Sequence, residues 1–256
     1  MSANRPSTAD PKLAVDATSG SDQQLPTEYP QDFQGEVEAN DQPPSAETLR
    51  KIQDYTVLDR HGKSHPFKGL YSGPGVAQRM LVIFVRHFFC GSCQEFLRTL
   101  SASITPGTLE LLAKRTSVVI IGCGDPGLIE MYEKETNCQF PIYADPTRQL
   151  YQDLDMMCSS ALGSQPAYIR KSMARVVGES MFQAMKYVPS GLAHKGGWYK
   201  QNGGEFLFEP LGGNVEMTGE EEKQVSWCHR MQTTRDHTEI PDLMRVLGID
   251  HKNDSK

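Results

Sequence analysis

The sequence predicts an α/β fold in which a central mixed sheet is flanked by helices. Two continuous apolar runs, Met80–Val85 and Val118–Ile121, are typical of strands covered on both faces. Segments with helical spacing follow each run, and a later pair of strands precedes one last helix. Because alternating strands and helices form parallel pairs with right-handed crossovers, this order indicates a parallel core with an antiparallel hairpin at one side.

Short elements precede the first buried run. Ser45 is expected to cap a helix over 46–54, and a strand over 55–58, a turn over 59–63 and a returning strand over 64–67 follow. Further expected elements are a helix after Cys93 that Pro106-Gly107 ends, a helix over 108–115, a helix from Asp125-Pro126 to Thr136, a strand over 140–144 and a helix from Asp145-Pro146 to Asp155.

The region 156–203 is expected to be an insertion, with a helix over 177–188. Met181, Phe182, Met185 and Val188 share one side of that helix, and packing is the favoured interpretation of this stripe. Strands over 205–209 and 225–231 form the expected hairpin, and Thr238 is the expected cap of the last helix. This order predicts a thioredoxin-like fold with an N-terminal extension and an insertion before the C-terminal hairpin.

Residues 1–46 differ in composition from the rest of the chain. They hold six of the 16 prolines and eight acidic but only two basic residues, which accounts for the whole net charge of −6. We expect a disordered acidic, proline-rich tail over 1–46, a thioredoxin-like domain over 47–250 and a polar C-terminal tail over 251–256.

Charge and hydropathy exclude several classes of function. The remainder of the chain has equal numbers of acidic and basic residues, so we expect no nucleic acid and no membrane as a partner. No apolar run is long enough to span a bilayer, and residues 1–10 lack the apolar stretch of a secretory signal. A cytoplasmic location is therefore expected, where six cysteines do not indicate a structural disulfide framework.

The chemistry is expected at Cys90-Gly91-Ser92-Cys93, where a buried strand gives way to a helix. The unpaired N–H groups of a helix's first turn stabilise a thiolate and lower its pKa. Cys90 is the predicted nucleophile, attacking a disulfide or the O–O bond of a peroxide. Cys93, one turn along the helix, is the predicted resolving thiol that closes a disulfide with Cys90.

The expected partners follow from this chemistry. A small-molecule peroxide or disulfide, or a protein disulfide, would be the substrate. An external thiol reductant protein would restore the dithiol, from a thioredoxin or glutathione system and ultimately from NADPH. No bound cofactor and no metal are expected.

The run Phe84–Glu95 closely resembles the peroxiredoxin-like 2 family of AhpC/TSA antioxidant-domain proteins, in a fungal-type member. The resemblance extends over about 50–248, through Tyr143–Pro146, Gly203–Phe206, His229-Arg230 and Asp236-His237. It implies a thioredoxin-like fold and a redox role for the two cysteines. Some members of that family reduce a lipid endoperoxide, so an endoperoxide-like metabolite joins the expected substrates.

The chain departs from two related patterns. Ordinary peroxiredoxins carry Thr or Ser, and Pro, where this chain has His87 and Ile83. Ordinary thioredoxins carry a buried acid where this chain has Phe84, and a cis-proline where it has Gly203-Gly204.

Other candidates have structural interpretations beside functional ones. Arg86 or His87 is expected to support the site by lowering the pKa of Cys90 or binding a substrate oxygen, and strand alternation lets only one face the sulfur. The groups after the last strand, Asp236-His237 among them, are predicted to hold the terminal helix, and Cys123 is predicted to fill the core. The alternative functions are a non-catalytic redox switch and, less favoured, a zinc-holding module that would need ligands such as Cys228-His229.

Overall fold

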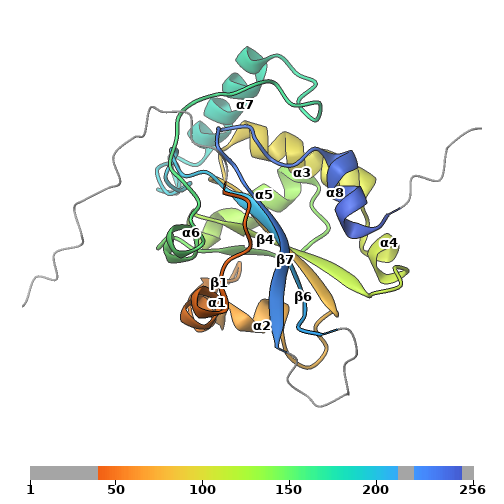
Figure 1. The fold of residues 1–256 in the computed structure, drawn as a ribbon. Helices are drawn as coiled ribbons and strands as arrows, with labels where there is room; N and C mark the ends of the chain where they lie inside the picture. Colours follow the sequence, from red (N-terminus) through yellow and green to blue (C-terminus); the bar gives the residue numbers. More distant parts are fainter. Residues whose placement is uncertain (1–39, 213–221, 250–256) are drawn as a thin grey trace, which may run out of the picture. The chain divides into compact units, whose positions relative to one another are not determined.

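The computed structural model describes residues 40–212 and 222–249, which form a seven-stranded mixed sheet with helices on both faces (Figure 1). The strands are β1 Thr56–Leu58, β2 Ser64–Pro66, β3 Arg79–Phe84, β4 Thr116–Gly122, β5 Ile142–Ala144, β6 Gly204–Pro210 and β7 Lys223–Arg230. The helices are α1 Ala46–Ile52, α2 Lys68–Tyr71, α3 Gly91–Ser103, α4 Pro106–Glu110, the 3-10 helix η1 Pro126–Leu128, α5 Ile129–Thr136, α6 Gln149–Asp153, α7 Met173–Lys186 and α8 Ile240–Leu247.

The sheet has the strand order β2-β1-β5-β4-β3-β6-β7. Within it, β3 and β4 are parallel, β4 and β5 are parallel, and β6 runs antiparallel to both β3 and β7. A parallel β–α–β unit beside an antiparallel hairpin, followed by a helix, is the thioredoxin arrangement. The predicted α/β thioredoxin-like fold is therefore confirmed.

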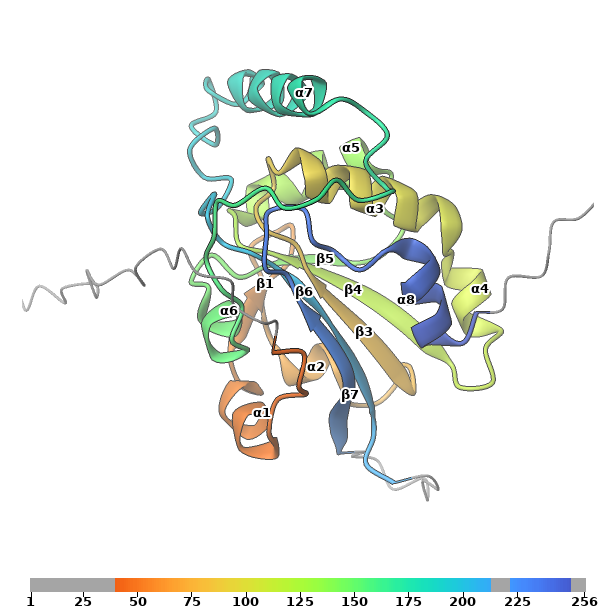
Figure 2. The same ribbon diagram turned by 45° about the horizontal axis from the view of Figure 1, so that its top comes forward.

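Two hydrophobic cores lie on opposite faces of the sheet, because successive residues of a strand point to opposite sides. Ile83 belongs to the core beneath α3, α5 and α8, while Phe84 belongs to the core beneath α1, α2 and α6 (Figure 2). Phe96, Leu97, Leu100 and Ile104 are all fully buried, as their helical spacing predicts. The first core therefore anchors the helix that carries the cysteine motif.

Helix α7 departs from the packing prediction. It lies outside α3 (Figure 2), and Met181, Phe182 and Met185 on it are 64%, 59% and 62% exposed. The helix meets the body of the domain through another side, on which Val176 and Gln183 are buried. The predicted stripe is thus real, but it faces solvent.

Several predicted helix boundaries differ from the structure, among them the expected helices over 108–115 and 177–188, which are α4 Pro106–Glu110 and α7 Met173–Lys186. Pro106 does not only end α3: Thr105 caps α4, and Pro106 occupies the first turn of that helix. Helix α6 begins at Gln149, later than predicted, and the Asp145 carboxylate accepts hydrogen bonds from the backbone N–H groups of Arg148, just before the helix, and Leu150, in its first turn. Thr238 does not cap α8, since Glu239 stands at that position and the Thr238 hydroxyl donates to a buried glutamate.

Residues 40–45 fall inside the predicted tail, and the structure places part of this stretch against β7. The Asp41 carboxylate accepts a hydrogen bond of 2.8 Å from the Arg230 backbone N–H. The Arg230 guanidinium donates to the carbonyl oxygens of Asn40 and Gln42. The rest of the predicted tail, 1–39, and the predicted C-terminal tail over 251–256 lie outside the described residues.

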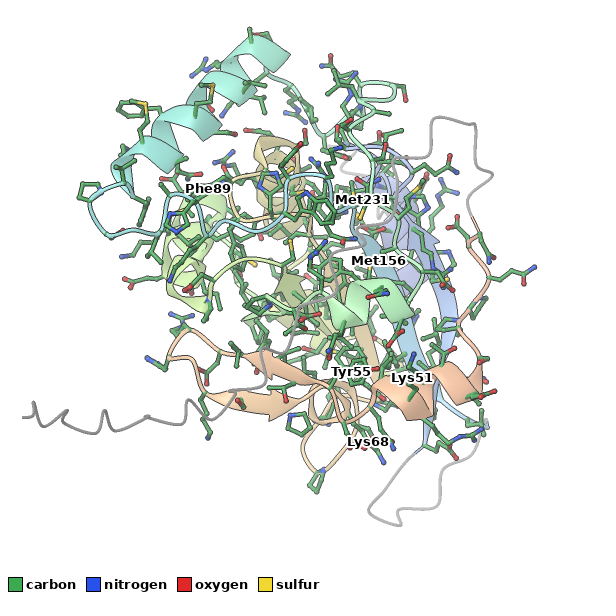
Figure 3. The ribbon with its side chains drawn as sticks, turned by 90° about the vertical axis from the view of Figure 1, so that its left-hand side faces the viewer. Lys51, Tyr55, Lys68, Phe89, Met156 and Met231 are labelled. Atoms are coloured by element: carbon green, nitrogen blue, oxygen red, sulfur yellow. The ribbon has the colours of Figure 1, made fainter. Side chains whose placement is uncertain are left out.

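Helix α1 and the residues just after it contact α6 through the carboxylate of Asp153. Lys51 Nζ lies 2.8 Å from Asp153 Oδ1, and the Tyr55 hydroxyl donates a hydrogen bond of 2.6 Å to Asp153 Oδ2. Figure 3 shows Lys51 and Tyr55 near each other at the end of α1.

No helix within the described ranges is both long and apolar enough to cross a membrane.

Candidate redox site

Cys90 stands at the N-cap of α3, six residues after β3 ends. Its backbone is extended, with φ −76° and ψ 104°, so its sulfur turns back over the first turn of the helix. There Cys90 Sγ accepts a hydrogen bond of 3.5 Å from the backbone N–H of Cys93. Cys90 is 4% exposed and Cys93 is fully buried. The structure thus brings the two predicted cysteines together at the positive end of a helix.

Arg86 is the cation of the site. It is buried, and its Nη1 lies 3.4 Å from Cys90 Sγ. Its remaining donors bond backbone carbonyl oxygens: Nε to Gln201 at 3.1 Å, Nη1 to Thr234 at 3.5 Å, and Nη2 to Tyr199. These carbonyl groups hold the guanidinium in place but leave its charge uncompensated, so the charge acts on the sulfur.

The two thiols have opposite acidities. A hydrogen bond from the Cys93 thiol, assisted by the charge of Arg86, holds the pKa of Cys90 well below its ordinary value, despite burial. Burial, together with that same hydrogen bond, raises the pKa of Cys93 well above its ordinary value. These directions favour the thiolate at Cys90 and the protonated thiol at Cys93, which is the combination that a nucleophile and a resolving thiol require.

His87 plays a smaller part than Arg86. Burial lowers the pKa of His87 to about 4, so its ring is neutral near pH 7 and carries no charge toward the sulfur. Its carbonyl oxygen accepts a hydrogen bond of 2.8 Å from the Cys90 backbone N–H. Of the two predicted supporting side chains, the structure thus places Arg86 against the sulfur.

A third side chain reaches the motif from the far end of the chain. His237 Nε2 lies 3.4 Å from Cys93 Sγ, and His237 Nδ1 lies 2.5 Å from Glu205 Oε1. Both Glu205 and His237 are buried. The sequence favours a structural role for His237 at the terminal helix, and the structure also places its ring in contact with Cys93. Glu205 was not among the predicted site residues. A lone acid in the apolar strand Gly204–Phe208 was the available signal.

Glu205 is a buried acid in the sheet beside the position at which ordinary thioredoxins carry one. Phe84 fills the expected position with an aromatic ring that packs against Tyr151 and Phe206. The acid comes instead from the neighbouring strand, where Glu205 pairs with Ile83. At Gly203, a Cβ would overlap the carbonyl oxygen of Phe84, so the close approach of the two chains requires glycine.

The other four cysteines are mostly buried. Cys123 donates a hydrogen bond of 2.8 Å to the Arg86 carbonyl oxygen, and burial raises its pKa to about 12. Burial likewise raises the pKa of Cys138 to about 11. Cys158 is partly exposed and lies 3.5 Å from Gln201 Oε1. No group of three potential metal ligands occurs among the described residues.

The strand order of the sheet and the helices that flank it define a protein of the thioredoxin-like fold class. The family described as AhpC/TSA antioxidant enzyme matches residues 104–233, about half of the chain, and the chain belongs to this family. The match begins after the cysteine motif.

Curated relatives add the narrower group. The chain is 28% identical to Peroxiredoxin-like 2C of Homo sapiens over 204 residues, which cover 79% of this chain and 81% of the human protein. It is 28% identical to Peroxiredoxin-like 2C of Takifugu rubripes over 204 residues, covering 78% and 82%. The predicted resemblance to the peroxiredoxin-like 2 family is thereby confirmed.

Solved structures with a similar fold have low identity. A peroxiredoxin-like protein from Aquifex aeolicus aligns with a TM-score of 0.42 and 10% identity, covering 84% of this chain and 88% of that one. The bacterioferritin comigratory protein of Xanthomonas campestris aligns with a TM-score of 0.40 and 9% identity, covering 82% and 98%.

Proposed function

We propose that this chain is a thiol-dependent oxidoreductase whose redox centre is the pair Cys90 and Cys93. The observation that carries the proposal is the contact of 3.4 Å between Arg86 Nη1 and Cys90 Sγ. A buried guanidinium that is hydrogen-bonded to uncharged carbonyl groups and lies beside a helix-capping sulfur favours a thiolate, which is the reactive form of cysteine.

The proposed reaction begins at Cys90. With a peroxide ROOH, the thiolate attacks the terminal oxygen, the O–O bond breaks, and RO⁻ takes up a proton and leaves as an alcohol. Cys90 becomes a sulfenic acid. Cys93 then attacks the Cys90 sulfur, the S–O bond breaks, and water leaves as the Cys90–Cys93 disulfide forms. With a disulfide substrate, a mixed disulfide takes the place of the sulfenic acid.

An external donor completes the proposed cycle. A thioredoxin or glutathione system, supplied by NADPH, would reduce the Cys90–Cys93 disulfide to the dithiol, without a cofactor bound to this chain. The reducing conditions of the cytoplasm suit such a donor. Peroxides, small disulfides, protein disulfides and an endoperoxide-like metabolite are the proposed substrate classes.

The test is coupled NADPH oxidation with a panel of these substrates and both reducing systems. Wild type should consume NADPH in a substrate-dependent manner, and Cys90→Ser should abolish the activity. Cys93→Ser should stop turnover after about one equivalent of substrate. Cys138→Ser is the matched control, because that buried thiol lies outside the site and should leave turnover intact. Activity that survives Cys90→Ser would refute the assigned nucleophile.

A non-catalytic redox switch is the second candidate function. The low exposure of Cys90, 4%, favours it over a freely accessible enzyme, because substrate must reach a nearly buried sulfur. In that case, wild type would form the Cys90–Cys93 disulfide with an oxidant but would not turn over with either reducing system.

A further inference from the structure

Cys93, His237 and Glu205 are joined by two successive contacts, from the thiol to the imidazole and from the imidazole to the carboxyl group. The distances are 3.4 Å from Cys93 Sγ to His237 Nε2 and 2.5 Å from His237 Nδ1 to Glu205 Oε1. The three groups come from three elements: α3, the segment before α8, and β6. Since all three are buried, solvent does not take the place of any of these contacts.

Further contacts fix the positions of His237 and of Glu205. The His237 ring stacks on Phe96 with 4.2 Å between the centroids and 10° between the planes. The His237 backbone N–H donates a hydrogen bond of 3.2 Å to the Tyr168 hydroxyl. The second oxygen of Glu205 accepts a hydrogen bond of 3.0 Å from the Thr238 hydroxyl. Among the described residues, the titratable side chains in contact with the ring are Cys93 and Glu205; Tyr168 contacts the His237 backbone, and His229 lies opposite Glu205 on β7.

The hydrogen-bond roles follow from the carboxylate. When Glu205 is a carboxylate, which accepts hydrogen bonds and donates none, a neutral His237 ring carries its proton on Nδ1 and donates it to Glu205. His237 Nε2 is then an acceptor aimed at the Cys93 sulfur. The same tautomer selection by an acid orients the base in nucleophile–histidine–acid triads.

The Cys93 thiol consequently has one proton and two acceptors, the Cys90 sulfur and His237 Nε2. In the dithiol state, its hydrogen bond stabilises the Cys90 thiolate. Once the Cys90 sulfur has been oxidised, it is no longer an anion and holds that proton weakly. His237 is then the stronger acceptor within reach.

We propose that His237 is the general base that deprotonates Cys93 in the resolving step, and that Glu205 is the positioning residue that orients it. This inference rests on the proposed redox role of the cysteine pair. The Cys93 S–H bond breaks, its proton passes to Nε2, and the thiolate attacks the Cys90 sulfur. If Cys90 is a sulfenic acid, the S–O bond breaks and the imidazolium returns its proton to the departing hydroxide, which leaves as water.

This transfer of the Cys93 proton through His237, oriented by Glu205 (the relay), would overcome the raised pKa of the Cys93 thiol. Burial holds the Cys93 proton at neutral pH, which would make spontaneous resolution slow. A positioned base typically accelerates such a proton transfer by about 10²–10⁴-fold. The arrangement thus keeps Cys93 protonated until Cys90 has reacted.

The test uses 4,4′-dithiodipyridine, which reports the two thiols separately and does not require the physiological substrate. The full chain carries Cys158→Ser, because Cys158 is the partly exposed cysteine outside the motif. Attack by Cys90 releases a first equivalent of thiopyridone, and attack by Cys93 on the mixed disulfide releases a second. His237→Gln should leave the first phase within about twofold and slow the second about 10²-fold at pH 7.

The pH profile separates a base from a structural contact. In His237→Gln, solvent must remove the Cys93 proton, so the second phase should accelerate about tenfold per pH unit between pH 6 and 8. The wild-type second phase should change less steeply. Glu205→Gln, which keeps the side chain's shape, should show an intermediate slowing with the same steepening. A conservative swap that merely loosened packing would not change the slope.

Two controls distinguish loss of the proposed base from a general disturbance of the fold. His65→Gln removes another partly buried histidine, on β2 at the opposite edge of the sheet, and should preserve both phases. An unfolded variant would expose its other cysteines and release more than two equivalents. An unchanged second phase in His237→Gln, or equal slowing of both phases, would overturn the relay. If wild type shows both phases but no NADPH-coupled turnover, the proposed enzyme function fails while the relay stands.

Discussion

Asp41 Oδ2 lies 3.1 Å from His229 Nδ1, although the two residues are 188 positions apart in the sequence. On its other side, His229 Nε2 lies 2.7 Å from the Asp236 carbonyl oxygen. His229 thus joins three segments: the stretch before α1, the strand β7 and the turn before α8. This contact makes the stability of the domain depend on the charge of one imidazole.

Stability should fall as pH rises above neutrality. Burial opposes a charge on His229, but Glu205, the Asp236 carbonyl and Asp41 outweigh it and raise the pKa to about 9. Because the folded pKa exceeds the unfolded value of about 6.5, the stabilisation is complete below pH 6.5 and is lost as pH rises through 9. We expect a loss of up to about 3 kcal/mol in urea unfolding measured from pH 6.5 to 10.

The measurement belongs in a Cys90→Ser background. The lowered pKa of Cys90 adds stability with rising pH over the same window and would mask the effect. His229→Gln should remove the fall in stability between pH 7 and 8, below the range in which the buried thiols with raised pKa begin to contribute. If the slope persists in His229→Gln, the imidazole is not its source.

Replacing Arg86 by methionine should lower the reactivity of Cys90 at neutral pH. The side chain keeps its approximate length but loses the charge, so the Cys90 pKa should rise. Iodoacetamide alkylation of Cys90, mapped by mass spectrometry at pH 6 to 7, should slow by about tenfold or more. Arg79→Met is the control, because Arg79 is another buried arginine on the opposite end of β3. Equal alkylation rates in wild type and Arg86→Met would contradict the assigned role.

Gly91→Ala should loosen α7 from the motif. A Cβ at this position would lie 2.5 Å from Val176 Cγ1 and 2.6 Å from Ser180 Oγ, so α7 would have to shift. Such overpacking costs about 1–3 kcal/mol, measurable in urea unfolding. Gly178→Ala on α7 meets nothing within 4 Å and should instead be neutral or stabilising by up to about 1 kcal/mol. Destabilisation of equal size in both variants would argue against the contact.

Side-chain truncations on the two sides of α7 should change the free energy of unfolding by different amounts. Met185→Ala should change the free energy of unfolding by about 0.5 kcal/mol or less, because Met185 is 62% exposed. Val176→Ala should cost about 1–3 kcal/mol, since Val176 is buried against the motif. A larger loss for Met185→Ala than for Val176→Ala would show that the apolar stripe is packed in solution.

Local patterns were sufficient for most of the framework. The apolar run at 80–85 predicts β3, and the Asp125-Pro126 signal and Asn137 correctly mark the beginning and end of the η1–α5 segment. These features depend on side chains within a few residues of each other. The helix N-cap position of Cys90 could be predicted for the same reason.

Long-range pairings could not be predicted in this way. His237 is 144 positions from Cys93 and 32 from Glu205, and only the fold brings them together. The direction of the α7 stripe is a similar case, because periodicity shows that a helix has an apolar side but not what lies against it. Pro106 shows the limit of a local signal, since proline suits both the end of one helix and the first turn of the next.

The carbonyl groups around Arg86 have an energetic consequence for the redox couple. They fix the guanidinium without neutralising it, so within the described part of the chain the Cys90 thiolate is the anion that faces this charge. In the proposed reaction, formation of the disulfide would remove that anion and leave the buried cation without a counterion among the described residues. The reduced state is favoured accordingly, so the pair should have a comparatively high reduction potential and should accept electrons readily from a donor thiol.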